Sequence, residues 1–225
     1  MCAGIGLFFV KANSRILLDA NTIPFAAACH WQMVVPVEFN ASGHLIIIAY
    51  FLHPPVMKAF FGFDAKEVTD KRIDLSLLSP AREVNLLQQL QDTPALSARL
   101  QLMDEYVLQL AGVCHSGVHD AVTYATRAIQ TANGLIFLQD LQREPCVTER
   151  TFQRMFESHV GVSPKMFRKI CQFDGAFRQL NPGKFSRLAD LAYEHDYADP
   201  SHFIRVSREF THRSPGEYLK NMPDV

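Results

Sequence analysis

The sequence predicts an α+β protein, with a small β-rich N-terminal domain that also carries helices, followed by an all-α C-terminal domain. Three observations support this prediction. Short apolar runs rich in β-branched residues concentrate before residue 53, apolar spacings of three and four dominate from residue 80, and a 51-residue repeat occupies about the last 90 of the 225 residues. We therefore expect domains of residues 1–111 and 134–225, joined by a helical connection of residues 112–133.

The composition is that of an ordinary globular chain. Hydrophobic residues make up 48% and charged residues 20% of the sequence, which excludes a disordered or fibrous chain. The net charge of −1 argues against a protein that coats nucleic acid or an anionic membrane along its whole length. One stretch, residues 145–187, is basic, with eight Lys or Arg against three Asp or Glu. The charge balance therefore does not exclude a local basic face that binds nucleic acid.

The cysteines and the N-terminal residues indicate the reducing cytosol as the compartment. The five cysteines are odd in number and form no CxxC motif, which argues against a disulfide framework or a zinc site. The apolar run Met1–Val10 is too short to span a membrane and has no basic segment before it. We expect a cytoplasmic protein with no membrane partner.

Strands are expected first. Gly6–Val10 and Arg15–Leu18 flank a turn-like Ala-Asn-Ser, which predicts a hairpin. Gln32–Phe39 is rich in valine and ends at the turn cluster Asn40–Gly43. His44–Leu52 is a nearly continuous apolar run, and its β-branched residues and short length favour a buried strand over a helix.

Helices follow from Pro54 onward. The pair Pro54-Pro55 can start a helix over Val56–Phe61, with Gly62 as its C-cap. Further helices are expected over Pro80–Gln91, after Pro94, and over Asp120–Ala132, where Asn133-Gly134 ends the last of them. The helix after Pro94 is predicted to bury one face, formed by Leu96, Leu100, Met103, Val107 and Leu110.

The last part of the chain repeats itself after 51 residues without gaps. The shift places Phe152 on Phe203 and Arg154 on Arg205, and it places Ser163-Pro164 on Ser214-Pro215. Each copy reads as helix, short turn, helix and the start of a third helix. The repeat therefore predicts two helix-turn-helix units, about 137–158 and about 187–210, joined by a long helix of about Pro164–Leu180.

In each unit the second helix is expected to be amphipathic. It begins after an N-cap residue type, Thr148 or Asp199. The predicted apolar faces are Phe152, Met155 and Phe156 in the first copy, and Phe203, Val206 and Phe210 in the second. The opposite, exposed faces are Arg150, Gln153, Arg154 and Glu157, and then Ser201, Ile204, Arg205 and Arg208.

Specific motifs accompany the repeat. They are Thr-Glu-Arg-Thr-Phe-Gln-Arg-Met-Phe at 148–156, Gly-Val-Ser-Pro at 161–164, Asp-Pro-Ser-His-Phe-Ile-Arg at 199–205 and Ser-Pro-Gly-Glu-Tyr at 214–218. With these motifs, Phe137–Tyr218 resembles the AraC/XylS-type DNA-binding domain of bacterial transcription regulators. The resemblance implies a sequence-specific, double-stranded DNA-binding transcription regulator with both recognition helices in successive major grooves. It also implies RNA polymerase as a partner.

The N-terminal half carries a second resemblance. Phe51-Leu52-His53-Pro54-Pro55, Phe60-Phe61-Gly62-Phe63 and Glu67-Val68-Thr69-Asp70 are similar to a poorly characterised domain found ahead of AraC-type helix-turn-helix domains. This resemblance implies a regulatory or sensing role, with an unidentified small-molecule effector as a candidate ligand. The oligomeric state stays open between a monomer and a homodimer.

Three residues of the second unit depart from the family pattern. Asp196-Tyr197 stands where the family usually has Gly-Phe, but Asp tolerates a left-handed backbone, so we expect the turn to persist. His212 stands where Gly161 lies in the first copy. Ser207 stands in place of Phe156 and removes an apolar contact, which predicts looser packing of the second unit.

Candidate DNA contacts follow from side-chain chemistry. Arg154 and Arg205 can bind guanine bidentately or hold a phosphate, and Gln153 can read adenine. Basic residues at the start of the connecting helix, where Lys169 also lies, can neutralise phosphates. The predicted contact set comprises Thr148, Arg150, Thr151, Gln153, Arg154, Lys165, Arg168, Ser201, His202, Ile204, Arg205 and Arg208.

Catalytic and metal sites are not expected. Cys114-His115 with Asp120 lacks an oxyanion turn, and no ligand spacing links His30, His44 and His53. We therefore predict no catalytic residue, no metal and no cofactor. The alternative hypothesis is an adaptor or enzyme that uses the N-terminal half and retains a degenerate helix-turn-helix domain.

Overall fold

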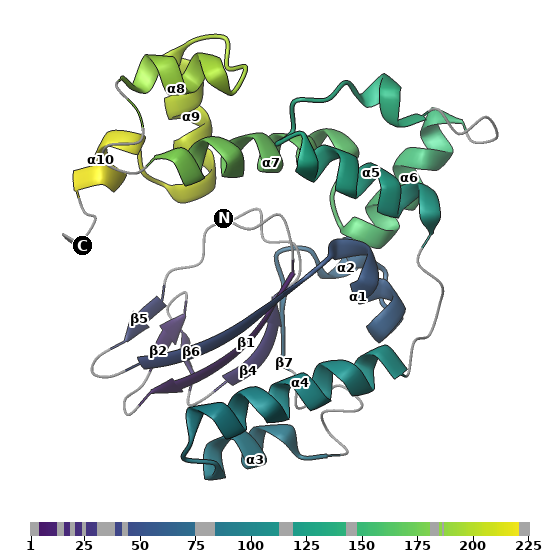
Figure 1. The fold of residues 1–225 in the computed structure, drawn as a ribbon, viewed down its shortest axis with the longest axis vertical. Coiled ribbons are helices and arrows are strands. Elements are labelled where there is room, and N and C mark those ends of the chain that lie inside the picture. The colour runs from purple at the N-terminus through teal and green to yellow at the C-terminus, as the bar shows by residue number, and fades with distance from the viewer. Residues whose placement is uncertain are drawn as a thin grey trace.

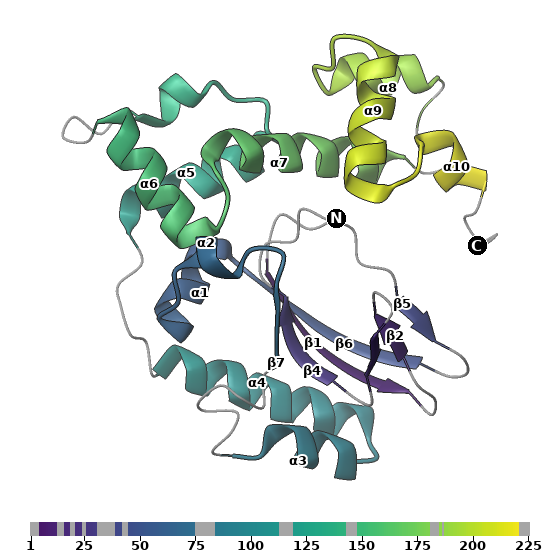
Figure 2. The same cartoon turned by 180° about the vertical axis from the view of Figure 1, so that it is seen from behind.

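The computed structural model describes residues 5–12, 16–18, 21–23, 26–30, 39–41, 45–74, 84–112, 119–142, 148–180, 185 and 187–220. Its elements form two regions. The N-terminal region contains strands β1–β7 and helices α1–α4, and the C-terminal region contains α5–α10 with the short 3-10 helix η2. Figures 1 and 2 show α7 extending between α5 and α6 at one end and α8–α10 at the other, with the sheet on one side of it.

The strands form two antiparallel sheets. One has the order β6-β1-β4-β7, and the other has the order β3-β2-β5. The strands are β1 (Ile5–Ala12), β2 (Ile16–Leu18), β3 (Asn21–Ile23), β4 (Ala26–His30), β5 (Phe39–Ala41), β6 (Leu45–Leu52) and β7 (Arg72–Asp74).

Two of the strand predictions are corrected by the pairing. The predicted hairpin of Gly6–Val10 with Arg15–Leu18 is wrong, because β1 pairs with β4 and β6, and β2 pairs with β3 and β5. The eight residues of β6 match β1 along its whole length, from Ile5 opposite Leu52 onward, which a three-residue partner cannot do. The turn expected from Asn40 is also wrong at its start, since Asn40 and Ala41 lie in β5. Residues 32–38 lie outside the described part.

The strand predicted over His44–Leu52 is present as β6, but it is not buried throughout. Among the described strands, β6 lies at the edge of its sheet and pairs with β1 alone. Ile48 is buried in the N-terminal core, whereas Phe51 is 56% exposed. Side chains alternate between the two faces of a strand, so a continuous apolar run does not require burial on both.

The N-terminal helices are α1 (Pro54–Phe61), α2 (Ala65–Val68), α3 (Leu86–Asp92) and α4 (Leu96–Gly112). The C-cap predicted at Gly62 is confirmed, with φ 70° and its N–H donating to Lys58 O at 2.8 Å. Within the described part of the helix predicted over Pro80–Gln91, α3 begins at Leu86, after Asn85, which has a left-handed backbone with φ 49°. Residues 75–83 are not described.

The predicted buried face of α4 is confirmed at Met103 and Leu110 and is wrong at the first turns of the helix. Leu96 and Leu100 are exposed, and the buried positions are Arg99, Met103, Tyr106 and Leu110. The observed set has the same spacings of three and four as the predicted set, so periodicity alone did not distinguish them. Arg99 takes a core position because its Nε donates to Leu90 O at 3.1 Å and Thr93 O at 2.6 Å, at the end of α3. A buried guanidinium needs such partners.

In the C-terminal region the described residues from 134 onward form helices and turns, with no strand among them, as the repeat predicted. The elements are α5 (Asp120–Thr131), η2 (Leu138–Gln142), α6 (Glu149–Val160), α7 (Pro164–Gln179), α8 (Leu188–Glu194), α9 (Pro200–Thr211) and α10 (Pro215–Lys220). Both α6 and α9 have 12 residues, and their bounds differ by the 51 residues of the repeat.

The three family departures fit the second unit without distorting it. Asp196 and His212 have left-handed backbones, with φ 56° and φ 57°, and His212 closes α9 as Gly161 closes α6. Buried Ser207 donates its hydroxyl to Arg213 O at 2.8 Å. Phe210, three residues further along α9, is fully buried as well. The looser packing expected from Ser207 stays a prediction.

One continuous core joins both repeats. The rings of Phe203 and Phe210 on α9 pack against Phe173 of α7, with centroid distances of 6.4 and 5.2 Å. On the other side, Phe156 of α6 packs against Phe167 of α7 at 5.7 Å. The same cluster includes apolar residues of α5. Because α7 belongs to both packing sites, it sets the position of α6 relative to α9.

A buried histidine near the second unit predicts a pH dependence of stability. The ring of His195 is buried, and neither nitrogen has a hydrogen-bond partner among the described residues. Burial lowers the pKa of His195 from its ordinary value of 6.5, so the unfolded chain binds the proton more readily than the folded one. Stability should therefore fall as the pH decreases through about 6.5.

The check is a set of urea titrations of the free energy of unfolding between about pH 7.5 and about pH 5.5. His195→Gln should flatten part of the decrease seen in the native chain. Burial also lowers the pKa of His53 and of His159, and these two groups should contribute to the rest of the decrease. The same pH dependence in both chains would contradict the assignment to His195.

Candidate DNA-binding interface

Helix α6 presents a polar face because its apolar face is fixed in the core. Phe152, Phe156 and Val160 are buried, while Arg150, Gln153 and Arg154 are exposed. Met155, predicted to lie on the apolar face, is partly buried against the same core. The structure therefore places the predicted contact residues of this helix together on its outer side.

The start of α6 is stabilised by its N-cap. Thr148 Oγ1 accepts a hydrogen bond from Thr151 N at 3.3 Å, and the two hydroxyl oxygens lie 2.9 Å apart. Both side chains are exposed. The two threonine hydroxyls are thus partly used by the helix itself, and they remain accessible at its N-terminal end.

Helix α9 repeats this arrangement. Phe203, Val206 and Phe210 are buried as predicted. Ser201, Arg205 and Arg208 are exposed, and His202 and Ile204 are half-buried. Asp199 caps the helix through Oδ1, which accepts from His202 N at 2.8 Å, and the His202 ring packs edge-on against Tyr197 at 5.4 Å.

The basic residues at the start of α7 line a hollow of about 450 Å³ that also reaches α9. Lys165 is exposed. Arg168 donates to Ile136 O at 3.3 Å, and Lys169 forms an ion pair with Glu209 at 2.6 Å. The structure thus brings Lys165, Arg168 and His202 to one place, but two of the basic side chains also hold the domain together.

Gln172 is a contact that the sequence analysis did not identify. Its Nε2 donates to His195 O at 2.7 Å and to Asp196 O at 3.3 Å, which ties α7 to the turn between α8 and α9. Carbonyls in a turn lack the partners that they would have inside a helix, so this amide satisfies them. No local sequence signal marks a polar residue in the middle of a helix for this role.

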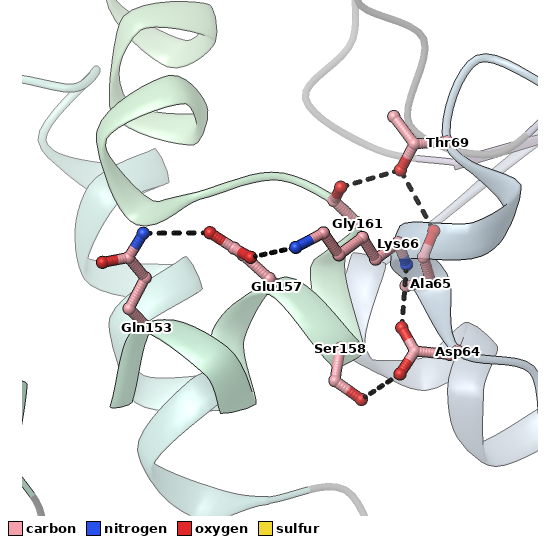
Figure 3. A network of polar contacts seen from close by, with 8 residues as sticks. All are labelled: Asp64, Ala65, Lys66, Thr69, Gln153, Glu157, Ser158 and Gly161. Carbon is pink, nitrogen blue, oxygen red and sulfur yellow. Dashed lines mark hydrogen bonds and ion pairs between the residues drawn. The ribbon is translucent and has the colours of Figure 1, made fainter. Parts of the chain in front are cut away.

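The exposed face of α6 meets the N-terminal region at its C-terminal end. Glu157 accepts from Lys66 Nζ at 2.9 Å and from Gln153 Nε2 at 3.0 Å (Figure 3). A hollow of about 500 Å³ lies between α2 and α6, with Lys66 and Arg154 among its lining residues. Glu157 was predicted to lie on the exposed face of the helix, but its side chain is only 17% exposed, and no sequence pattern connects it with Lys66.

These contacts shift the pKa values of Glu157 and Lys66 in opposite directions. The hydrogen bond from Lys66, followed by that from Gln153, holds the pKa of Glu157 below its usual value of 4.5. The same bond to Glu157 raises the pKa of Lys66. Both groups are therefore charged at neutral pH, and the ammonium group of Lys66 compensates the negative charge of the Glu157 carboxylate between α2 and α6.

The residues considered for catalysis or metal binding are only partly described. Cys114, His115 and His44 lie outside the described part, and His30 ends β4. His53 is the N-cap residue of α1, and its ring nitrogen lies 3.5 Å from Thr126 Oγ1. Within the described segments, no group of three or more His, Cys, Asp or Glu residues can hold a metal ion.

Of the helices that the structure describes, none combines the length and the apolar character needed to cross a bilayer.

Comparisons with known proteins agree with the geometry. A family of helix-turn-helix domains matches residues 141–221. A relative described as an uncharacterised HTH-type transcriptional regulator of Haemophilus influenzae is 28% identical over 85 residues, which are 38% of this chain. The matched segment spans 28% of the length of that relative.

Solved structures match over nearly the whole chain. A structure of ToxT from Vibrio cholerae has a TM-score of 0.54 at 10% identity, covering 99% of this chain and 91% of ToxT. A structure of wild-type ToxT bound to an unsaturated fatty acid has a TM-score of 0.53 at 12% identity, covering 99% and 90%. At these identities the similarity concerns the fold. The family match identifies residues 141–221 as a helix-turn-helix domain, in agreement with the AraC-type resemblance of its sequence motifs.

Proposed function

We propose that this protein is a sequence-specific regulator of transcription that binds double-stranded DNA, with α6 and α9 as recognition helices. One observation carries the proposal. Two 12-residue helices have the same register within the repeat, and each exposes an arginine at its sixth position, Arg154 and Arg205. Recognition helices present such exposed polar positions to base edges while their apolar sides hold the domain.

The proposed arrangement places the two helices in successive major grooves on the same side of one duplex, about one DNA turn or roughly 34 Å apart. Helix α7 connects them, because Phe167 packs against Phe156 of α6 and Phe173 packs against Phe203 of α9.

The candidate contacts divide into base and phosphate contacts. Arg154 and Arg205 are proposed to bind guanine, and Gln153 to bind adenine. Lys165 and Arg168 are proposed to bind phosphates near the start of α7. The remaining candidates, Thr148, Arg150, Thr151, Ser201, His202, Ile204 and Arg208, complete the two surfaces.

The N-terminal region is proposed to regulate this activity. It contacts α6 directly, so a ligand that changes its conformation can act on DNA binding. The fatty acid in one ToxT structure supports a small-molecule effector for this protein too. RNA polymerase is the partner that a DNA-bound activator of this kind would contact.

The alternative, an adaptor or enzyme with a degenerate DNA-binding domain, has less support. It depended on Asp196, Ser207 and His212 as signs of degeneration. All three are accommodated by left-handed backbones or by a hydrogen bond, and the second repeat keeps its core and its exposed arginines.

Mobility-shift titrations with genomic fragments over a salt series test the proposed function. Each phosphate contact contributes about −0.9 to the slope of log K against log salt. If about four of the six basic candidates contact phosphates, the affinity should fall by about 100-fold between about 50 and 200 mM salt. A few fragments should survive competition by DNA of scrambled sequence. Absent or salt-insensitive binding would contradict the proposal.

A further inference from the structure

A chain of three side chains links the N-terminal region to the centre of α6. Lys66 of α2 donates to one carboxylate oxygen of Glu157, and Gln153 donates its amide N–H to the other (Figure 3). Gln153 and Glu157 lie four residues apart on the same helix, so their side chains are neighbours. The chain ends at the residue proposed to read adenine.

The hydrogen bond from Gln153 to Glu157 fixes the orientation of the Gln153 side-chain amide. An ionised carboxylate only accepts hydrogen bonds, so it can bond to the nitrogen of the amide and not to its oxygen. The amide oxygen and the second N–H remain available. Adenine recognition needs both, because the amide must accept from the base amino group and donate to N7.

The hydrogen bond from Lys66 holds the Glu157 side chain in place. A glutamate on a helix surface samples several rotamers, and the Lys66 ammonium restricts the carboxylate to one of them. Lys66 also supplies a positive charge beside a carboxylate that would otherwise repel nearby DNA phosphates. Its side chain remains 68% exposed, so this charge is accessible from solvent.

Other contacts keep α2 beside α6 without touching this chain. Ser158 Oγ donates to Asp64 Oδ2 at 3.0 Å, and Thr69 Oγ1 lies 2.8 Å from Gly161 O. Lys58 also bonds to the Ser158 hydroxyl. The contact between the two regions therefore has parts that can be removed separately.

We propose that Glu157 is a positioning residue for base reading by Gln153, and that Lys66 makes this positioning depend on the N-terminal region. The N-terminal region then influences which base is preferred at one position of the DNA site, besides any effect on overall affinity. This inference rests on the proposed function, because it assumes that Gln153 contacts a base.

The test is selection of bound sequences from a double-stranded DNA library with a randomised centre, using the full chain. Lys66→Met and Glu157→Ala should each lower the base discrimination at one position by about fivefold or more, at the position that Gln153→Ala also affects. Lys66→Met should add nothing in the Gln153→Ala background, since both changes act through one interaction. Thr69→Val, which removes a different contact between the regions, should leave the discrimination unchanged.

Several results would overturn the inference. Unchanged discrimination in Lys66→Met would do so, as would an equal loss in Thr69→Val. Uniformly tighter binding to all sequences in Lys66→Met would indicate an inhibitory contact instead. Thermal melts of each variant exclude unfolding as the cause. A native chain that selects no sequence would refute the proposed function itself, whereas selection by the native chain without an effect of Lys66→Met refutes only this inference.

Discussion

Replacement of Gly134 by alanine is expected to destabilise the C-terminal region by about 3 kcal/mol or more. Gly134 has φ +74°, a conformation that L-residues with a side chain rarely adopt. A Cβ there would lie 2.3 Å from Arg168 O and 2.6 Å from Gln172 N. Both atoms belong to the backbone of α7, so the clash can be relieved only by moving the helix that holds both repeats.

Urea or guanidinium unfolding measures this effect. Gly216→Ala is the matched control in the same region, because its added Cβ would meet nothing within 4 Å. Gly216 lies in α10, where alanine favours the helix by up to about 1 kcal/mol. A Gly134→Ala chain as stable as the native one would show that the segment after α5 can move away from α7.

Replacement of Arg154 by alanine is expected to weaken specific DNA binding by about 1–3 kcal/mol, or roughly 5- to 150-fold. Arg154 is exposed on α6, on the side opposite the buried Phe152 and Phe156. Removing a base-reading side chain there should relax the preference at one base pair and change binding to unrelated DNA less. Thermal stability should hardly change, because an exposed arginine contributes little to the core.

The measurement is a pair of titrations, one with the selected DNA site and one with scrambled DNA. Arg205→Ala should behave in the same way at a position about one DNA turn away. Arg127→Ala removes an exposed arginine of α5 and serves as the control that should leave binding unchanged. If Arg154→Ala unfolds the domain or binds as tightly as the native chain, the assigned role of the exposed α6 face is wrong.

Much of the C-terminal region could be predicted from the sequence, because its signals are local. The N-caps at Thr148, Ser163 and Asp199 form within three residues of their partners. The apolar periodicity of α6 and α9 determines which side of each helix is buried, and therefore which candidate contacts are exposed. The repeat added a second copy that had to satisfy the same pattern.

Local patterns did not predict the structure where a helix face or a strand had more than one packing partner available. Two stripes of α4 have the same spacings, and Arg99 takes its buried position through hydrogen bonds to backbone carbonyls at the end of α3. The hairpin expected near the N-terminus was predicted from a short turn, whereas β1 pairs with β6, which is a longer strand than β2. Strand pairing is decided by the whole sheet and not by neighbouring residues.

Local sequence signals were therefore sufficient to specify the two repeated helices and the side that each exposes, since caps and helical periodicity act over a few residues. Tertiary packing was needed to join Lys66 to Glu157, which lie 91 residues apart, and to place Gly134 against the backbone of α7. Such contacts depend on how separate regions pack together. No pattern along the chain specifies that packing, because the apolar surfaces that drive it are non-directional.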